Sequence, residues 1–271
     1  MRGPFASAGT RQMTATDTVP AAARSSRRTL EVCVDSAEGL LAAVRAGANR
    51  IELCSALGLA GLTPGPGLMR LAATLPCPAY AMIRPSPGDY VVTPHELDVM
   101  LGDIDAALEA GLPGVVLGAC RPGGELDEAI LARLIHQADG RGATLHRVFD
   151  AVPDMGRALE TAIDLGFERV LTSGGAAGAP QGVATIARLV EQATGRISVM
   201  AGAGLNPGNV ADVIARTGVS EVHGSCGASL AWPDAARAAA LDHVYGAGFS
   251  AVRVTDEATV VAIVAILRDL A

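Results

Sequence analysis

Residues 29–56 read TLEVCVDSAEGLLAAVRAGANRIELCSA, and this stretch decides the fold. The β-branched and apolar runs at its two ends, Thr29–Asp35 and Arg50–Ala56, are typical of buried strands. The segment between them is rich in Ala and Leu, begins after Ser36 and ends at a glycine, which are the usual start and stop signals of a helix. The stretch therefore predicts one strand–helix–strand unit with parallel strands.

The same unit repeats along most of the chain. The predicted strands are Thr29–Asp35, Arg50–Ala56, Ala79–Pro85, Gly114–Cys120, Ala143–Asp150, Arg169–Gly175, Ile197–Gly204 and Glu221–Gly227. No GxGxxG motif follows the first strand, and an open sheet would leave edge strands, so we predict a closed (β/α)8 TIM barrel. A last helix over Asp256–Leu270 is expected to close the ring, whereas the pattern does not place Trp232–Val254.

Length and composition fit a single domain. A TIM barrel takes up about 250 residues, so we assign residues 29–271 to one α/β barrel domain and residues 1–28 to a disordered tail. No stretch is long and apolar enough to be a membrane span. A net charge of -7 and 3% aromatic residues argue against nucleic acid or an anionic membrane as a partner.

The cysteines indicate the cellular location, and the basic residues limit the classes of enzyme that the protein can belong to. The five cysteines are odd in number and form no CxxC pair, which indicates a reducing, cytoplasmic location rather than a disulfide scaffold. All 21 basic residues are arginine. Because Schiff-base and pyridoxal phosphate chemistry both need a lysine amine, the sequence excludes both of these enzyme classes.

Alternation along the predicted strands separates the side chains that face the helices from those that face the barrel interior. The aliphatic residues of the first strand share one face, so Glu31 and Cys33 are predicted to point inward. Glu52 and Cys54 repeat this Glu-x-Cys arrangement on the second strand. Arg147 has the opposite parity and would need a bulge to turn inward. The other predicted inward residues are Tyr80, Met82, Arg84, His146, Asp150, Met200, His223 and Ser225.

A polar barrel interior has two interpretations. It is either a satisfied ion-pair network, joining Glu31 and Glu52 to Arg84, or a functional site. The functional interpretation is favoured at the strand ends, where barrel enzymes keep their catalytic groups. The polar residues predicted there are Arg84, Asp150, Ser173 and Ser225.

An anion site is predicted beside the last two strands. The seventh strand ends in AGAG over residues 201–204 and leads into a helix that opens near Asn206. Exposed N–H groups and a helix N-terminus favour an anion, and TIM barrels usually bind phosphate in this region. The predicted substrate-binding residues are Ser173, Gly202, Gly204 and Ser225.

Two inward thiols suggest a metal. Cys33 and Cys54 lie on neighbouring strands near Met82, and thiolate and thioether ligands suit a soft cation such as Cu(I). Cysteine is also a common small buried hydrophobe, so burial without a ligand is the alternative.

Several motifs resemble the CutC family in order and spacing. They are LEVCVDS, RIELCSALGLAGLTP, MIRP followed by GDY, HRVFD, RVLTSGG, MAGAG and EVHGS, between Leu30 and about Ser229. The resemblance implies a cytoplasmic TIM barrel, usually an oligomer, that binds copper and takes part in copper homeostasis. It makes Cys33 and Cys54 candidate copper ligands. It also places six candidate catalytic residues at the barrel mouth, namely Glu52, Arg84, His146, Arg147, Asp150 and His223.

The sequence therefore leaves two main hypotheses. The first is a homo-oligomeric protein that handles Cu(I) through Cys33 and Cys54. The second is an enzyme of lyase or isomerase type that acts on a small anionic or phosphorylated metabolite by acid–base chemistry without a Schiff base. In that case His146 or Glu52 would move protons, and Arg84 would hold the carboxylate or phosphate. A scaffold with an indirect copper role is a third interpretation.

Overall fold

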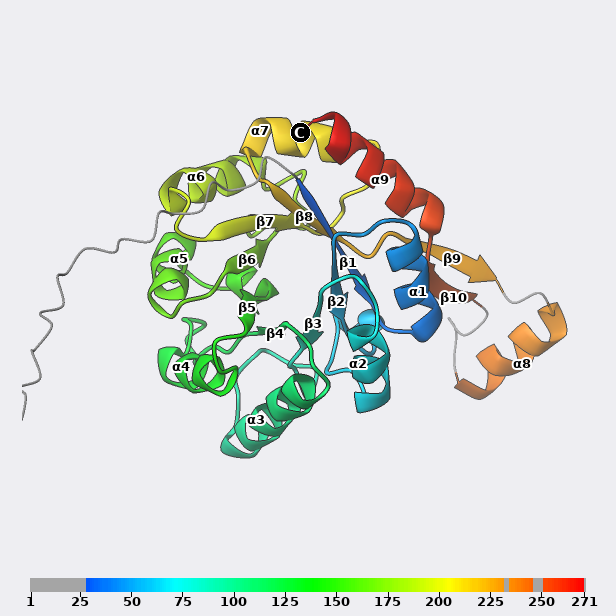
Figure 1. Ribbon diagram of the computed structural model, residues 1–271, viewed down its shortest axis with the longest axis horizontal. Helices are drawn as coiled ribbons and strands as arrows, with labels where there is room; N and C mark the ends of the chain where they lie inside the picture. The colour runs from blue at the N-terminus through cyan, green and yellow to red at the C-terminus, as the bar shows by residue number, and fades with distance from the viewer. Residues whose placement is uncertain (1–27, 232–233, 246–250, 271) are drawn as a thin grey trace, which may run out of the picture.

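Eight parallel strands form the centre of the protein. The computed structural model describes residues 28–231, 234–245 and 251–270. The strands close into a barrel in chain order, with the last paired to the first (Figure 1). They are β1 (Thr29–Val34), β2 (Arg50–Leu53), β3 (Ala79–Met82), β4 (Gly114–Leu117), β5 (Gly142–Leu145), β6 (Arg169–Thr172), β7 (Ser198–Gly202) and β8 (Glu221–Gly224). The predicted (β/α)8 fold is confirmed.

The strands end earlier than the sequence pattern predicts. The largest difference is in the predicted strand Ala143–Asp150, where β5 ends at Leu145 and Arg147–Asp150 form the 3-10 helix η2. The ring of His146 caps η2 by accepting a hydrogen bond from the backbone N–H of Val148. The segment after β5 is therefore a turn, and strand parity does not apply to it.

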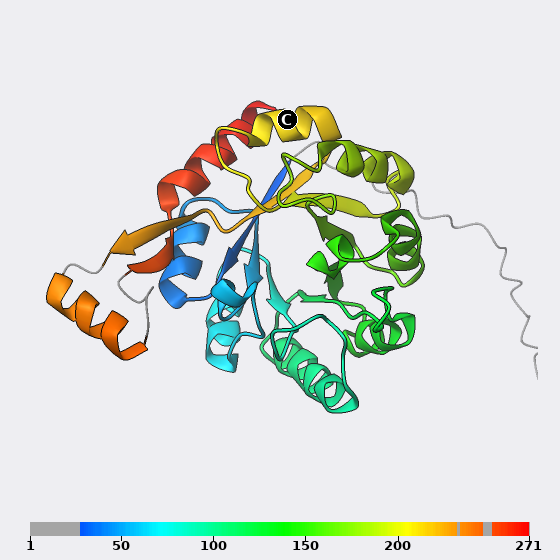
Figure 2. The same ribbon diagram turned by 180° about the vertical axis from the view of Figure 1, so that it is seen from behind.

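Helices surround the ring on its outer side (Figures 1 and 2). They are α1 (Ala37–Arg45), α2 (Pro66–Ala73), α3 (Pro94–Glu109), α4 (Glu128–Gln137), α5 (Met155–Asp164), α6 (Val183–Ala193), α7 (Val210–Thr217) and α9 (Glu257–Asp269), with the 3-10 helix η1 (Leu57–Leu59) before α2. Capping residues fix where they begin. Ser36 accepts from the N–H of Gly39, and Thr93 forms a capping box with Glu96.

The buried apolar residues form two groups that follow the predicted alternation. Leu30, Val32 and Ile51 belong to the large group that packs between the ring and the helices. Cys54 and Tyr80 belong to a small second group, with Met82 and Val116, on the opposite face of the strands. The polar positions of β1 and β2 therefore face the barrel interior, as predicted.

One segment leaves the ring between β8 and α9. β9 (Gly227–Ala231) and β10 (Ala251–Thr255) form a two-stranded antiparallel sheet, and α8 (Ala235–Tyr245) lies beyond it, away from the ring (Figures 1 and 2). The backbone N–H of Asp256 donates to the carbonyl oxygen of Cys226 at 2.8 Å, so the two ends of this segment meet. We call residues 227–255 the arm. It contains the whole stretch that the sequence pattern did not place.

The predicted tail falls almost wholly outside the described residues. Only Arg28 of residues 1–28 is described, and its guanidinium donates to the carbonyl oxygen of Val219 at 2.9 Å. The division into a tail and one barrel domain stays a prediction. Within the described ranges, every helix is too short or too polar to cross a membrane.

Candidate functional site

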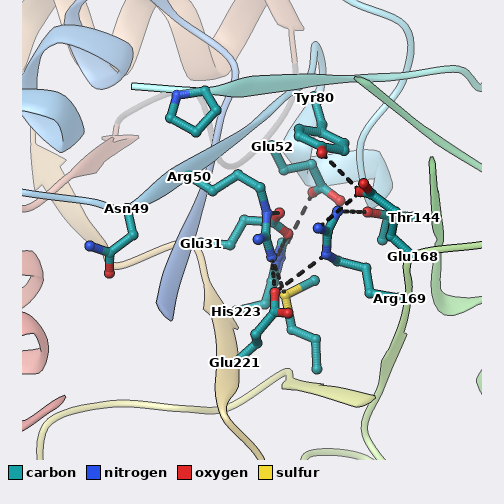
Figure 3. Close-up of polar contacts among 12 residues, drawn as sticks. Glu31, Asn49, Arg50, Glu52, Tyr80, Thr144, Glu168, Arg169, Glu221 and His223 are labelled. Carbon is teal, nitrogen blue, oxygen red and sulfur yellow. Dashed lines mark hydrogen bonds and ion pairs between the residues drawn. The ribbon is translucent and has the colours of Figure 1, made fainter. Parts of the chain in front are cut away.

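A network of ion pairs joins residues at the starts of several barrel strands (Figure 3). Arg50 pairs with both Glu31 and Glu221. Arg169 pairs with Glu221 at 3.3 Å and with Glu168 at 3.0 Å. We call this network the charged floor, and its members are Glu31, Arg50, Tyr80, Thr144, Glu168, Arg169 and Glu221.

The ion pairs of the charged floor differ from those expected from the sequence. A network was expected to join Glu31 and Glu52 to Arg84, but Arg50 takes the place of Arg84. The strand register explains this, because Glu31 is paired with Arg50 on β2 and with His223 on β8. Arg50 shares the face of Glu52, so alternation could have placed it inward. The register between strands could not be derived from the sequence.

Glu31 is the central acid of the floor. It is fully buried, and burial alone would raise its pKa. The charge of Arg50 and the hydrogen bond to His223 outweigh burial and lower the pKa of Glu31 from 4.5 to about 2. Glu31 is therefore ionised at neutral pH, and its Oε1 lies 2.8 Å from Nδ1 of His223.

Three potential metal ligands lie directly above the floor. The thiol of Cys33, a carboxylate oxygen of Glu52 and a ring nitrogen of His223 all lie within 4.8 Å of one another, and all three residues are buried. The register between β1 and β2 pairs Cys33 with Glu52. We call these residues the Cys33–Glu52–His223 cluster.

Glu52 and His223 hold protons more tightly than usual. Burial raises the pKa of Glu52. Burial would lower the pKa of His223, but the neighbouring carboxyl groups of Glu52 and Glu31, together with Cys33, raise it well above its usual value. Nε2 of His223 lies 3.8 Å from Oε2 of Glu52, so a protonated His223 and an ionised Glu52 form an ion pair.

Cys54 lies beside the cluster rather than in it. It is fully buried among the side chains of Tyr80 and Met82, and its thiol donates to Oε2 of Glu52 at 3.6 Å. The strand register places Glu52, two residues before Cys54, opposite Cys33. The predicted pair of thiols is therefore replaced by a thiol, a carboxylate and an imidazole.

A cavity of about 1540 Å³ opens above the cluster at the carboxyl ends of the strands. The arm and η1 contribute to its walls. The predicted residues that line it are Cys33, Glu52, Arg84, His146, Arg147, Asp150, Gly204, His223 and Ser225. Nine of the twelve predicted site residues thus share one cavity, and Cys54, Ser173 and Gly202 lie behind its surface.

Arg84 and His146 form one wall of the cavity. The guanidinium of Arg84 donates to the carbonyl oxygens of Leu59 and Gly61 at 2.8 and 3.0 Å. The ring of Tyr90 contacts both residues, because its centroid lies 5.0 Å from Cζ of Arg84 and 4.9 Å from the ring centroid of His146. Tyr90 follows the MIRP motif in a loop, where the strand pattern carries no signal for it.

Asp150 acts as a clamp between two loops. Its carboxylate accepts from the hydroxyl of Thr172 at 2.6 Å and from the backbone N–H groups of Ser173 and Gly175 at 3.0 Å. It also pairs with Nε of Arg147 at 2.8 Å. These donors lower the pKa of Asp150 in spite of its burial. The geometry assigns this carboxylate to holding η2 against the loop after β6.

Arg147 and Ser173 belong to the same clamp. Nη2 of Arg147 donates to Oγ of Ser173 at 2.8 Å, and Ser173 is fully buried. The 3-10 helix η2, rather than a bulge in the strand, brings Arg147 to the cavity. The predicted role of Ser173 in binding substrate stays untested, but its hydroxyl lies 2.6 Å from the carbonyl oxygen of Ala176 rather than at the cavity surface.

The glycines at the end of β7 have different surroundings. A Cβ atom on Gly202 would lie 2.6 Å from Cδ1 of Leu171 and 3.3 Å from Cβ of His223. Gly202 therefore lets β7 pass close to His223. Gly204 lines the cavity and has a φ of +73°, which favours glycine. The arm adds Arg253, which the sequence pattern did not identify.

Comparisons with known proteins place the chain in one family. The model described as the CutC family matches residues 28–228. A CutC family protein of Caulobacter vibrioides (strain NA1000 / CB15N) is 57% identical over 205 residues, which cover 76% of this chain and 84% of the relative. A CutC family protein of Agrobacterium fabrum is 54% identical over 231 residues, which cover 85% of this chain and 90% of the relative.

A solved structure is also similar. It comes from Streptococcus agalactiae and is provisionally described as the copper homeostasis protein CutC. It is 29% identical to this chain with a TM-score of 0.71, and the match covers 73% of this chain and 98% of that protein.

Proposed function

Because the chain belongs to the CutC family, we propose that it takes part in copper homeostasis and binds Cu(I) at the Cys33–Glu52–His223 cluster. Cu(I) prefers soft thiolate ligands and also accepts imidazole, so Cys33 and His223 are the primary ligands of this proposal, and Glu52 completes the set. A cytoplasmic location and a homo-oligomeric state, which the family resemblance implies, are part of the same proposal.

The observation that carries this proposal is the hydrogen bond between His223 and Glu31. Metal-bound histidines usually donate their second ring N–H to a carboxylate, which fixes the orientation of the ring. Nδ1 of His223 lies 2.8 Å from the ionised carboxylate of Glu31, which directs Nε2 toward Glu52. Cys33 lines the cavity, so an ion can reach it from solvent. A bound Cu(I) would displace the proton of His223.

Anaerobic Cu(I) titration of single variants tests the proposal. We expect Cys33→Ser to weaken Cu(I) binding by about 100-fold or more, because loss of even an outer partner of a metal ligand costs about 10- to 100-fold. Cys54→Ser should weaken Cu(I) binding less, because Cys54 lies outside the cluster and reaches it through a hydrogen bond to Glu52. Equal affinity of the wild type and Cys33→Ser would exclude the cluster as the copper site.

Cys77→Ser is the matched control. Cys77 is buried like Cys33, but its thiol contacts the backbone carbonyl of Ala48 at 3.3 Å and does not line the cavity. Its replacement should leave the affinity for Cu(I) unchanged. A similar loss of Cu(I) affinity in Cys33→Ser, Cys54→Ser and Cys77→Ser would indicate general unfolding rather than the loss of a ligand.

A second candidate function is an acid–base enzyme of lyase or isomerase type that acts on a small anionic or phosphorylated substrate. One observation favours it. Oε1 of Glu52 is buried at the cavity wall and has no hydrogen-bond partner among the described residues. An unpaired carboxyl oxygen that faces a cavity can exchange a proton with a bound substrate. The absence of lysine from the sequence excludes a Schiff-base mechanism.

Proton exchange with solvent tests this second candidate. Phosphorylated α-hydroxy carbonyl compounds would be incubated with the protein in D2O, and NMR would follow exchange of the α proton. We expect exchange with at least one compound, and Glu52→Gln should slow it by about 100-fold or more, as for loss of a general acid or base. Glu160→Gln on the surface is the control. If the α proton of every compound exchanges no faster with the protein than in buffer alone, the enzyme candidate would be contradicted.

A further inference from the structure

Arg84 is a buried cation whose charge is not balanced by a nearby acid. It is 8% exposed, and its Nη1 atom donates to two neutral carbonyl oxygens, those of Leu59 and Gly61. Among the described residues, no carboxylate oxygen lies within 4.0 Å of its guanidinium, whereas Arg50, Arg147 and Arg169 are all paired. An unpaired buried charge is costly unless a ligand supplies the opposite charge.

His146 lines the same cavity and carries an unused hydrogen-bond donor. Its Nδ1 accepts from the backbone N–H of Val148 at 3.2 Å, so the proton of the neutral ring must lie on Nε2. Burial and the charge of Arg84 lower the pKa of His146 to about 3, which keeps the ring neutral at pH 7. Nε2 is buried and has no partner in the described part of the chain. A ligand oxygen would satisfy this donor.

The two donors are held in place rigidly. Tyr90 contacts both side chains, at 5.0 Å for Arg84 and 4.9 Å for His146. Gly118 provides the space for the imidazole, because a Cβ atom there would lie 2.6 Å from Nδ1 of His146. The carbonyl oxygens of Leu59 and Gly61 fix the guanidinium. A preorganised pair of donors binds an anion without the entropic cost of ordering side chains.

We propose that Arg84 and His146 form an anion subsite that binds the carboxylate or phosphate group of a small ligand in the cavity. The subsite offers N–H donors and a net positive charge. It is separate from the Cys33–Glu52–His223 cluster. Arg147 adds little charge to it, because Asp150 already pairs with Arg147. The subsite deepens the second candidate function by naming the group through which a substrate is held, and it rests on that function only for the chemistry after binding.

Isothermal titration with matched probes tests the subsite. Glycerol 3-phosphate presents a phosphate group, glycerate presents a carboxylate, and glycerol is the neutral control. We expect the wild type to bind at least one of the two anions and not to bind glycerol. Comparison of the two anions identifies which group the subsite prefers. Failure of both anions to bind at millimolar concentrations, or equal binding of glycerol, would overturn the proposal.

Variants assign the binding to the two residues. Arg84→Gln should weaken binding of the preferred anion by at least about tenfold, since it removes a buried charged partner. Arg84→Lys should retain part of the affinity. His146→Asn should weaken it as well, because an Asn oxygen can still accept from Val148 but the Nε2 donor is lost. Arg70→Gln removes an exposed arginine on α2 and should change nothing. Unchanged affinity in Arg84→Gln or His146→Asn would overturn the assignment.

The outcomes separate this proposal from the two functions. Thermal unfolding of each variant checks that it folds, and if Arg84→Gln is unfolded, His146→Asn decides. The Arg84→Gln variant should still bind Cu(I), because Arg84 is not part of the cluster. Anion binding without proton exchange would overturn the enzyme candidate and leave the subsite intact. If Arg84→Gln and His146→Asn both catalyse proton exchange at the wild-type rate, the subsite proposal would be overturned and the enzyme candidate would stand.

Discussion

Replacement of Glu31 by glutamine is expected to lower the free energy of unfolding by about 3–5 kcal/mol, the cost of removing one partner from a buried ion pair. Glu31 is 0% exposed and pairs with both Arg50 and His223. Glutamine has nearly the same shape but no charge. The substitution therefore leaves the Arg50 charge with Glu221 as its remaining carboxylate and leaves His223 without the acid that orients it.

Urea unfolding followed by circular dichroism measures this effect. The matched control is Glu160→Gln, which removes the acid of an exposed pair with Arg196, where the side chains are 42% and 44% exposed. Exposed pairs contribute about 0–1 kcal/mol, so this variant should remain close to the wild type. A loss below about 1 kcal/mol in Glu31→Gln would show that the charged floor does not stabilise the barrel.

The pH dependence of the same two proteins gives an independent check. The pKa of Glu31 is about 2 in the folded protein, against 4.5 as its ordinary value. A lowered pKa stabilises the folded state fully above 4.5, and this contribution is lost as the pH falls toward 2. Glu31→Gln lacks this contribution at every pH. The difference in stability between the two proteins should therefore shrink in this acid range.

Replacement of Gly114 by alanine is expected to destabilise the barrel by about 3 kcal/mol, at the upper end of the usual cost of overpacking. A Cβ atom at Gly114 would lie 2.5 Å from Cδ1 of Tyr80 and 2.6 Å from the carbonyl oxygen of Gly142. Both neighbours are fixed, because the ladder pairs Gly114 with Tyr80 on one side and with Gly142 on the other. The ring of Tyr80 would have to leave its place over Arg169.

Thermal unfolding measures this loss, and a drop of about 10 °C is expected for a barrel of this size. Gly102→Ala is the control. Gly102 lies inside α3, and a Cβ atom there would meet nothing within 4 Å. Alanine favours a helix over glycine by about 1 kcal/mol, so this variant should be as stable as the wild type or more stable. A similar loss in both variants would contradict the steric explanation.

Local patterns predicted the ring and the direction of most site residues. The alternation in β1 and β2 depends only on the pleat of a single strand, so it correctly turned Glu31, Cys33 and Glu52 inward. Which residues meet across strands depends on the register, which is set by closure of the whole ring. For this reason the sequence pattern missed Arg50 as the partner of Glu31. The same register separates Cys54 from the cluster.

The segment after β5 shows a second limit of strand patterns. Parity predicted that Arg147 points outward and that Asp150 points inward from one long strand. The chain instead turns into η2, which brings both residues to the cavity and ties them to the loop after β6. A short turn of this kind is fixed by its capping bonds. These bonds involve the side chain of His146 and the backbone of Val148, and they carry little signal in the sequence.

The meeting of the two ends of the arm has a consequence for changes within it. Because the backbone of Asp256 is hydrogen-bonded to that of Cys226 where the arm departs and returns, the chain enters and leaves the arm at one point, so a change of length within the arm need not move β8 or α9. The arm nevertheless contributes Val252, Arg253 and Val254 to the entrance of the cavity. Substitutions in the arm can therefore alter which molecules enter the cavity without changing the residues of the charged floor.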